Sequence, residues 1–136
     1  MKDDQIETLL RERLHEAQDG VWFCTIPFGG PEPDVEIEVL APRNEPSTAH
    51  VRRVASCQQL RPAMERALNA APASDPLFPP ERPCEWWLES ISFTNPDSSY
   101  GQVVFTLSEP GYEYIYVAYH VEVHGLEIGR VYATTR

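Results

Sequence analysis

A histidine, a glutamate and a second histidine alternate near the end of the sequence, in the stretch HVEVH at 120–124. If this β-branched stretch is a strand, the three side chains share one face. His120 and Glu122 then lie about 7 Å apart and could share a metal ion, whereas His120 and His124 lie about 13 Å apart, too far for one ion. Because no third ligand is evident, we expect no metal and no other cofactor, and we interpret the histidines as surface residues at a strand end.

The three cysteines do not form a recognisable nucleophile or metal site. Cys24, Cys57 and Cys84 are widely spaced and lack the Cys-x-x-Cys spacing of a zinc knuckle. A cysteine nucleophile needs a histidine and an orienting acid beside it, and nothing in the sequence brings these together. Gly29 and Gly30 precede prolines instead of a helix, so they do not form a phosphate-binding loop. We therefore predict reduced, structural cysteines and a protein that is not an enzyme.

Three tyrosines alternate ahead of the histidines, Tyr112, Tyr114 and Tyr116, in the stretch GYEYIYVAYHVEVHG at 111–125. If this stretch is one strand, its apolar face carries Ile115, Val117, Tyr119, Val121 and Val123. Its other face carries Tyr112, Tyr114, Tyr116, Ala118, His120 and Glu122. Tyrosine and tryptophan beside scattered acids are typical of protein interfaces, because they offer large contact areas with few rotatable bonds and a polar tip. The alternative is that aromatic cross-strand pairs merely suit a half-exposed sheet.

The elements that must position this face begin with a helix and a hairpin. Asp4 and Glu7 have capping-box spacing ahead of an apolar stripe of helical period, which predicts a helix over residues 5–18 that ends at Gly20. The stretches Val21–Phe28 and Val35–Ala41 are β-branched or alternating, and the turn residues GGPEPD separate them. This pattern predicts a β-hairpin.

A second helical segment follows, with Ser47 or Thr48 as its N-cap. Apolar residues recur at helical spacing from Leu60 to Leu68, but Pro62 interrupts the hydrogen bonding of a helix. The sequence therefore predicts either a helix kinked near Gln58 or two short helices, over 48–58 and 61–70. A strand over residues 50–55 is a weaker alternative. The proline-rich stretch 71–83 is expected to be a stiff surface connector.

Four strands are predicted to complete the chain, over residues 85–94, 102–107, 113–123 and 127–134, with turns at NPDSSYG, SEPGY and HG. These elements indicate one α+β domain over residues 1–136, with an antiparallel sheet of about six strands, a hairpin plus a four-stranded meander, and two helices packed on one face. The residues expected in the core include Leu9, Leu10, Leu68, Trp87, Ile91, Phe93, Val103, Phe105, Leu107, Ile115 and Val117.

Two helices leave the other face of such a sheet uncovered. Alternation places Trp86, Leu88, Ser90 and Ser92 on that face beside the tyrosines. We therefore predict a partner-binding surface on the uncovered face, made of Trp86, Tyr112, Glu113, Tyr114, Tyr116, His120 and Glu122.

The charge of the chain indicates what kind of partner it binds. The net charge is −10, and between Glu81 and Glu127 there are eight acidic residues against one basic residue, Arg82. Nucleic acids and anionic membranes are poor partners for this half, because phosphate contacts need clustered basic residues. A basic protein surface is a good one, although surplus acid also serves solubility. The oligomeric state does not follow from the sequence.

The N-terminus and the apolar runs bear on location. The sequence begins Met1-Lys2-Asp3-Asp4, without the basic start and apolar run of a signal peptide. No apolar run approaches the roughly 18 residues of a membrane span. We expect a cytoplasmic protein.

A small acidic domain with Tyr112, Tyr114, Tyr116 and Glu122 on an open sheet face resembles bacterial polymorphic-toxin immunity proteins. The resemblance is one of protein class, and it implies that the chain neutralises a cognate, often basic, toxin by capping its active site. Secretion-effector chaperones are similar in size, acidity and order of elements, but they usually close on a helix. The closing segment YHVEVHGLEIGRVYATT resembles the last hairpin of the cone-shaped fold of small ligand-binding proteins and isomerases, which implies a pocket between sheet and helices.

Overall fold

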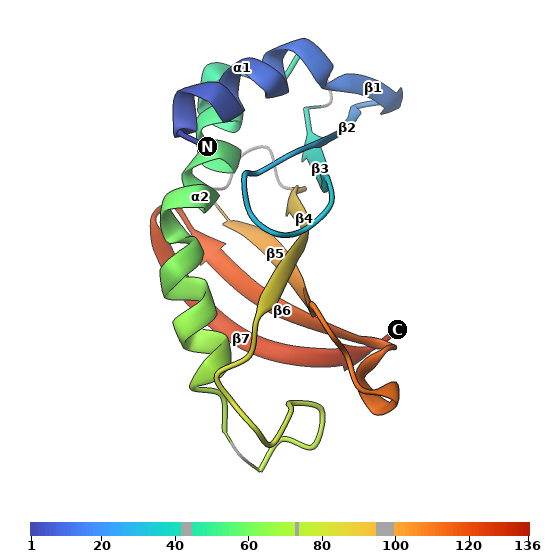
Figure 1. Ribbon diagram of the computed structural model, residues 1–136. Helices are drawn as coiled ribbons and strands as arrows, with labels where there is room; N and C mark the ends of the chain where they lie inside the picture. Colours follow the sequence, from blue (N-terminus) through green and yellow to red (C-terminus); the bar gives the residue numbers. More distant parts are fainter. Residues whose placement is uncertain (42–44, 73, 95–99) are drawn as a thin grey trace.

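The computed structural model describes residues 1–41, 45–72, 74–94 and 100–136. Its elements in chain order are α1 (Asp3–Arg13), β1 (His15–Gln18), β2 (Val21–Ile26), β3 (Val35–Leu40), α2 (Thr48–Asn69), β4 (Trp86–Phe93), β5 (Tyr100–Leu107), the 3-10 turn η1 (Tyr112–Tyr114), β6 (Val117–His124) and β7 (Glu127–Thr135). The strands form one sheet, α2 lies along one face of it, and α1 packs against α2 and β2 (Figure 1). The α+β prediction, with the helices on one face, is confirmed.

The seven strands lie in the sheet in the order in which they occur in the chain. Neighbouring strands are antiparallel except for β3 and β4, which are parallel. Parallel neighbours need a long crossover, and α2 provides it. The predicted hairpin and meander are therefore both present, but the parallel junction between them and a seventh strand, β1, were not predicted.

The first helix is shorter than predicted. It ends at Arg13, and residues 15–18 form β1, which pairs with the edge of β2. Gly20 has a φ of +76°, a conformation that suits glycine, and it reverses the chain between these two strands. Pairing with β2 satisfies those backbone groups of residues 15–18 that face β2, so this tertiary contact overrides their helical pattern. The helix also begins earlier than predicted. Its N-cap is Lys2, whose backbone N–H donates to Gln5 Oε1 at 2.8 Å.

The second helical segment is one continuous helix that contains Pro62. Ser47 is its N-cap, as predicted, and its Oγ accepts the backbone N–H of His50 at 3.3 Å. The predictions of two short helices and of a strand over 50–55 are wrong. A proline inside a helix costs about 3 kcal/mol, and burial of residues on both sides of it, such as Val54 and Leu68, offsets that cost.

A β-bulge just after Leu88 changes which residues of strand β4 point toward the core. Trp86 and Leu88 are buried before the bulge, and Ile91 and Phe93 are buried after it. One extra residue shifts the alternation by one position. The prediction that Trp86 and Leu88 lie on the uncovered face is therefore wrong, and so is the prediction that Trp87 belongs to the core.

Strand β6 begins at Val117, four residues later than predicted. The residues before it form the turn η1, and Ile115 is 51 % exposed, so its assignment to the core is wrong. Pro110 and Gly111 stand immediately before this turn, and such residues favour chain reversal over continued pairing. From Tyr119 onward the strand alternates as predicted, with Tyr119 itself buried, but Ala118, which was predicted on the uncovered face, is buried as well.

The core between α2 and the sheet is a single cluster of hydrophobic side chains. Its members include eight of the eleven core residues predicted above: Leu10, Leu68, Ile91, Phe93, Val103, Phe105, Leu107 and Val117. Leu9 is only partly buried against this cluster. The turn predicted at NPDSSYG falls mainly on 95–99, outside the described residues. Within the described residues, no helix is long and apolar enough to cross a membrane.

Candidate functional site

The predicted partner-binding residues separate into three groups in the structure. Trp86 is buried in the core. Tyr112, Glu113, Tyr114 and Tyr116 lie on the turn that precedes β6. His120 and Glu122 lie further along β6, on the face of the sheet that the helices do not cover. The second and third groups lie at the surface and differ in their chemistry.

The turn at residues 111–116, here called the tyrosine turn, exposes large hydrophobic side chains. Tyr112 is 87 % exposed, Ile115 is 51 % exposed and Tyr116 is 64 % exposed. Tyr114 is the anchor of the turn, because it packs against the core and its backbone N–H donates to the Gly111 carbonyl at 2.9 Å. The tyrosine turn therefore presents three apolar side chains to solvent around one that is held in place.

A groove of about 640 Å³ lies beside the tyrosine turn, and we call it the terminal groove. It is lined by Pro79, Pro80, Glu81, Pro83, Cys84, Glu85, Leu107, Ser108, Glu109, Gly111 and Tyr114. Within the described part of the chain, none of its three glutamates makes an ion pair. Arg82 faces elsewhere: its guanidinium lies 5.7 Å from the ring centre of Phe78 and donates to the Leu68 carbonyl. The groove is therefore acidic, with prolines and a tyrosine in its wall.

His120 and Glu122 belong to a polar network on the uncovered face. His120 Nε2 lies 2.7 Å from Thr134 Oγ1, and the His120 ring stacks on Tyr132 with centroids 4.6 Å apart. Glu122 lies 4.0 Å from Arg130, whose guanidinium sits over the Tyr132 ring. Burial lowers the pKa of His120, and the positive charge of Arg136 lowers it further. These side chains are engaged with one another across β6 and β7.

His120, Glu122 and His124 are not arranged around a common point where a metal ion could bind. His124 turns to the ring of Tyr100, with centroids 5.0 Å apart. Among the described residues, no group of three or more His, Cys, Asp and Glu side chains is arranged to hold a metal ion.

Trp86 has a structural role, contrary to its predicted place in the binding surface. Its indole Nε1 donates to Asn69 Oδ1 at 2.9 Å, and its ring packs edge-on against Tyr119 with centroids 4.9 Å apart. A partner cannot reach it without opening the contact between α2 and the sheet.

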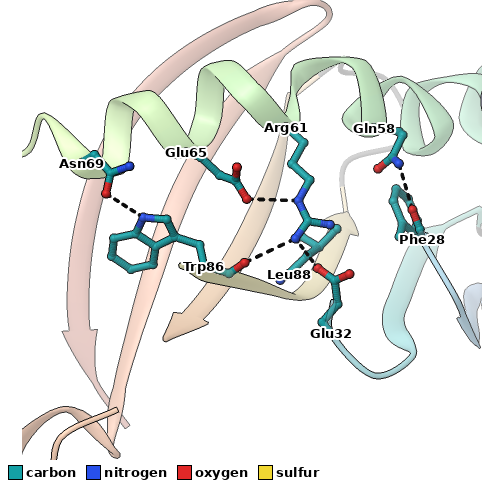
Figure 2. A network of polar contacts seen from close by, with 8 residues as sticks. All are labelled: Phe28, Glu32, Gln58, Arg61, Glu65, Asn69, Trp86 and Leu88. Carbon is teal, nitrogen blue, oxygen red and sulfur yellow. Dashed lines mark hydrogen bonds and ion pairs between the residues drawn. The ribbon is translucent and has the colours of Figure 1, made fainter. Parts of the chain in front are cut away.

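A nearly buried ion pair between Glu32 and Arg61 holds the loop after Phe28 against α2 and β4 (Figure 2). The Glu32 side chain is 1 % exposed and the Arg61 side chain 11 %. Glu32 Oε1 also accepts the backbone N–H of Leu88 at 2.9 Å, and Arg61 donates to the Trp86 carbonyl at 3.3 Å. This pair could not be predicted from the sequence, because its members are 29 positions apart and neither stands in a recognisable motif.

Glu65 is the second carboxylate on Arg61, at 3.2 Å from its Nε. Burial by itself lowers the pKa of Arg61, but the hydrogen bonds and negative charges of Glu32 and Glu65 raise it above its ordinary value. Gln58, one turn earlier on α2, donates to the Phe28 carbonyl at 2.8 Å (Figure 2). These contacts fix the loop over residues 28–34.

A second concave site, here called the Trp87 pocket, lies between this loop and the sheet. It has a volume of about 220 Å³ and is lined by Glu32, Pro33, Asp34, Glu36, Trp87, Leu88, Glu89 and Thr106. The two carboxylate oxygens of Glu89 accept hydrogen bonds from the two terminal nitrogens of the Arg136 guanidinium, and the Nη1–Oε1 distance is 2.7 Å. This pocket could not be predicted from the sequence, because the β4 bulge places Trp87, and not Trp86, on the uncovered face.

The cysteines are not arranged as nucleophiles. Burial raises the pKa of Cys24 to about 11 and that of Cys57 to about 12. Burial also raises the pKa of Cys84, and the positive charge of the nearby Arg82 offsets part of that rise. A thiol with a raised pKa stays protonated near neutral pH, and the protonated form is a poor nucleophile.

We compared the chain with protein-family models, with curated proteins and with solved structures, and none of these comparisons gave a match.

Proposed function

We propose that this chain is a non-enzymatic acidic domain that binds a basic protein, and that this partner is a bacterial toxin which the chain neutralises in the cytoplasm. The observation that carries the proposal is the tyrosine turn, which exposes Tyr112, Ile115 and Tyr116 and lines the acidic terminal groove with Gly111 and Tyr114.

The tyrosine turn has the composition of an interface hot spot. Exposed single hydrophobic residues are ordinary, but a group of them beside polar residues marks an interaction site. Tyrosine is enriched among the residues that contribute most to binding, because burying it removes a large area from water at a small entropic cost. Tyr114 holds the turn in place, since its partial burial fixes the backbone that carries the exposed side chains.

The terminal groove supports a basic partner. Glu81, Glu85 and Glu109 contribute negative charge to one concave surface. A cluster of negative charges attracts a positively charged partner, raises the rate of association with it and disfavours acidic competitors. Glu113 adds a further carboxylate on the tyrosine turn itself.

Neutralisation of a toxin is the specific part of the proposal. It is supported by the small acidic domain, by raised cysteine pKa values that suit no nucleophile, and by a surface suited to covering a basic site. A domain of this kind acts by occupying the partner, so it needs contact area and charge instead of catalytic groups.

The alternative, a pocket for a small ligand between the helices and the sheet, has less support. Such a pocket needs convergent polar groups within an apolar cavity. The side chains buried between α2 and the sheet are hydrophobic and form one cluster, and the concave sites described above open at the surface.

The proposal is tested by growth of a bacterial host that expresses the product of the gene adjacent to this one. We expect growth arrest that co-expression of the wild-type chain relieves. The Leu126→Ala variant, which alters an exposed hydrophobic residue in the β6–β7 turn, is expected to protect equally well. The double variant Tyr112→Ala/Tyr116→Ala is expected to lose protection while still accumulating as folded protein. Equal protection by the double variant, or no relief by the wild type, contradicts the proposal.

A further inference from the structure

We propose that two copies of this chain associate through strand β7, whose outer edge pairs antiparallel with the same edge of a second copy. This inference goes beyond the proposed function and does not rest on it, because it concerns a different surface. β7 is the last strand in the order of the sheet, so among the described strands only β6 pairs with it (Figure 1).

One hydrogen bond shows which backbone groups of β7 point outward. The N–H of Arg136 donates to the Tyr116 carbonyl at 2.6 Å, so the backbone groups of residue 136 face β6. In a regular antiparallel pair, successive residues point their backbone groups to opposite sides. Every second residue before Arg136 therefore also faces β6, and the residues between them face away. The outward N–H and C=O groups belong to Val131, Ala133 and Thr135.

These outward groups form a template for another strand. Within the described part of the chain, no backbone hydrogen bond from outside the β6–β7 pair reaches them. A row of exposed donors and acceptors at a sheet edge readily pairs with a strand of another chain. The template is also held in a fixed shape, because β7 is in register with β6 from Val131 to Thr135.

The two edges of the sheet differ in how well they are protected. Proteins commonly protect an edge by making it short, by a bulge, or by placing proline or lysine on it. At the other edge, β1 has only four residues, and its pairing with β2 is irregular. β7 has nine residues and contains neither proline nor lysine, and its register shift opposite Glu122 lies before Val131. The regular part of β7, residues 131–135, lacks the protection that β1 has.

The side chains at this edge leave the core incompletely covered. Val131 pairs with the buried Val121, and Ala133 pairs with the buried Tyr119, so both lie on the core face of the sheet. Both are only partly buried against the core cluster. A strand added beside β7 covers their exposed parts and continues the hydrophobic layer, which removes apolar surface from water.

The charge of the edge favours a second copy over the basic partner proposed above. Residues 128–136 contain no acidic residue, although the whole chain carries a net charge of −10. Both arginines of this segment are paired with carboxylates of the chain itself, Arg130 with Glu122 and Arg136 with Glu89. A basic segment therefore finds no unpaired carboxylate on this strand, whereas two copies meet there through a segment without unpaired acid.

Antiparallel pairing about Ala133 uses the whole regular segment. Ala133 then lies opposite Ala133 of the second copy, and Val131 lies opposite Thr135, so each outward N–H meets an outward C=O. Arg130 comes opposite Arg136 in this register, and the ion pair that each makes with its own carboxylate offsets the like charges. Because the same patch serves both copies, the contact closes at a dimer.

The test is amide hydrogen exchange of ¹⁵N-labelled protein, observed by NMR in a dilute and in a concentrated sample, with sedimentation equilibrium on both. We expect the dimer fraction to rise with concentration, and the amides of Val131 and Ala133 to exchange about tenfold or more slowly in the concentrated sample. Tyr132 and Thr134 are the internal reference, because their amides face β6 and should exchange at similar rates in both samples. A chain that stays monomeric overturns the proposal, and so does a dimer in which Val131 and Ala133 exchange as in the monomer.

Variants at the edge locate the contact. Ala133→Pro removes an outward N–H and spares the hydrogen bonds to β6, so we expect it to fold and to raise the Kd of the dimer about tenfold or more. Thr135→Lys places a lysine at an exposed position of the same edge and should raise the Kd about fivefold or more. Ala17→Lys is the matched control, because it makes the same change of charge at an exposed position of β1. We expect it to change the Kd less than about twofold. If Thr135→Lys dimerises as tightly as Ala17→Lys, the proposal is overturned, whether or not Ala133→Pro folds.

Discussion

The indole Nε1 of Trp86 donates a hydrogen bond to Asn69 Oδ1, 2.9 Å away, across the contact between β4 and α2. Trp87, the next residue, lies on the opposite face of the strand and lines a surface pocket. Two adjacent tryptophans thus have different roles, one in stability and one at the surface.

This difference predicts unequal effects of the same substitution. Trp86→Phe removes the hydrogen bond and leaves unfilled space in the core, so we expect the free energy of unfolding to fall by about 1–3 kcal/mol. Trp87→Phe is the matched control and should change it by about 0.5 kcal/mol or less. Urea denaturation measures both values, and equal losses would mean that the two faces of β4 are wrongly assigned.

The buried ion pair makes a second prediction. Glu32→Gln leaves the Arg61 guanidinium without its most buried partner, and we expect a loss of about 3 kcal/mol in urea denaturation. Glu65 is 35 % exposed, so Glu65→Gln should cost less than about 1 kcal/mol. The double variant Glu32→Gln/Arg61→Met should cost less than the sum of its two single variants, because the second change removes the uncompensated charge. Additive losses would show that the pair is not coupled.

The core is tested by comparing a buried residue with an exposed one. Leu68→Ala should lower the free energy of unfolding by about 2–5 kcal/mol, since it empties space between α2 and the sheet. Phe105→Ala should do the same from the side of the sheet. Ile115→Ala should cost less than about 0.5 kcal/mol, because this side chain already faces solvent. A large loss from Ile115→Ala would place the tyrosine turn inside the core.

The lowered pKa of His120 predicts a pH dependence of stability. Burial and the charge of Arg136 hold this pKa below its ordinary value of 6.5, so the unfolded chain binds a proton at a higher pH than the folded one. Stability therefore decreases as the pH falls from neutrality through 6.5 towards the folded-state pKa. His50, whose pKa is also lowered by burial and by Arg53, acts in the same direction. Thermal melts of His120→Gln should show a shallower decline over this window than the wild type, and an unchanged slope contradicts the assignment.

Much of the fold could be predicted from local pattern. The hairpin of β2 and β3, the Ser47 cap and the buried face of β6 all follow from periodicity and turn residues within a short window. The core position of Leu68 follows from helical spacing in the same way. Local pattern is informative there because each side chain contacts what its own element faces.

The remaining features depend on contacts that no local pattern encodes. The β4 bulge displaces Trp86 and Trp87 by one position, and a single extra residue has no sequence signature here. Residues 15–18 look helical but become a strand because the edge of β2 is available to pair with them. The tyrosines could be recognised as interface residues, yet their place on a turn could not, since they also alternate as a strand does.

The tyrosine turn is the centre of the proposed function, and calorimetric titration with the product of the adjacent gene tests it most directly. Tyr112→Ala and Tyr116→Ala should each weaken binding by about 2 kcal/mol or more, with thermal melts close to that of the wild type. Leu126→Ala is the control, because Leu126 is about as exposed as Tyr116 but lies beyond the other end of β6. If the tyrosine variants bind as tightly as Leu126→Ala does, the tyrosine turn is not the binding surface and the account is contradicted.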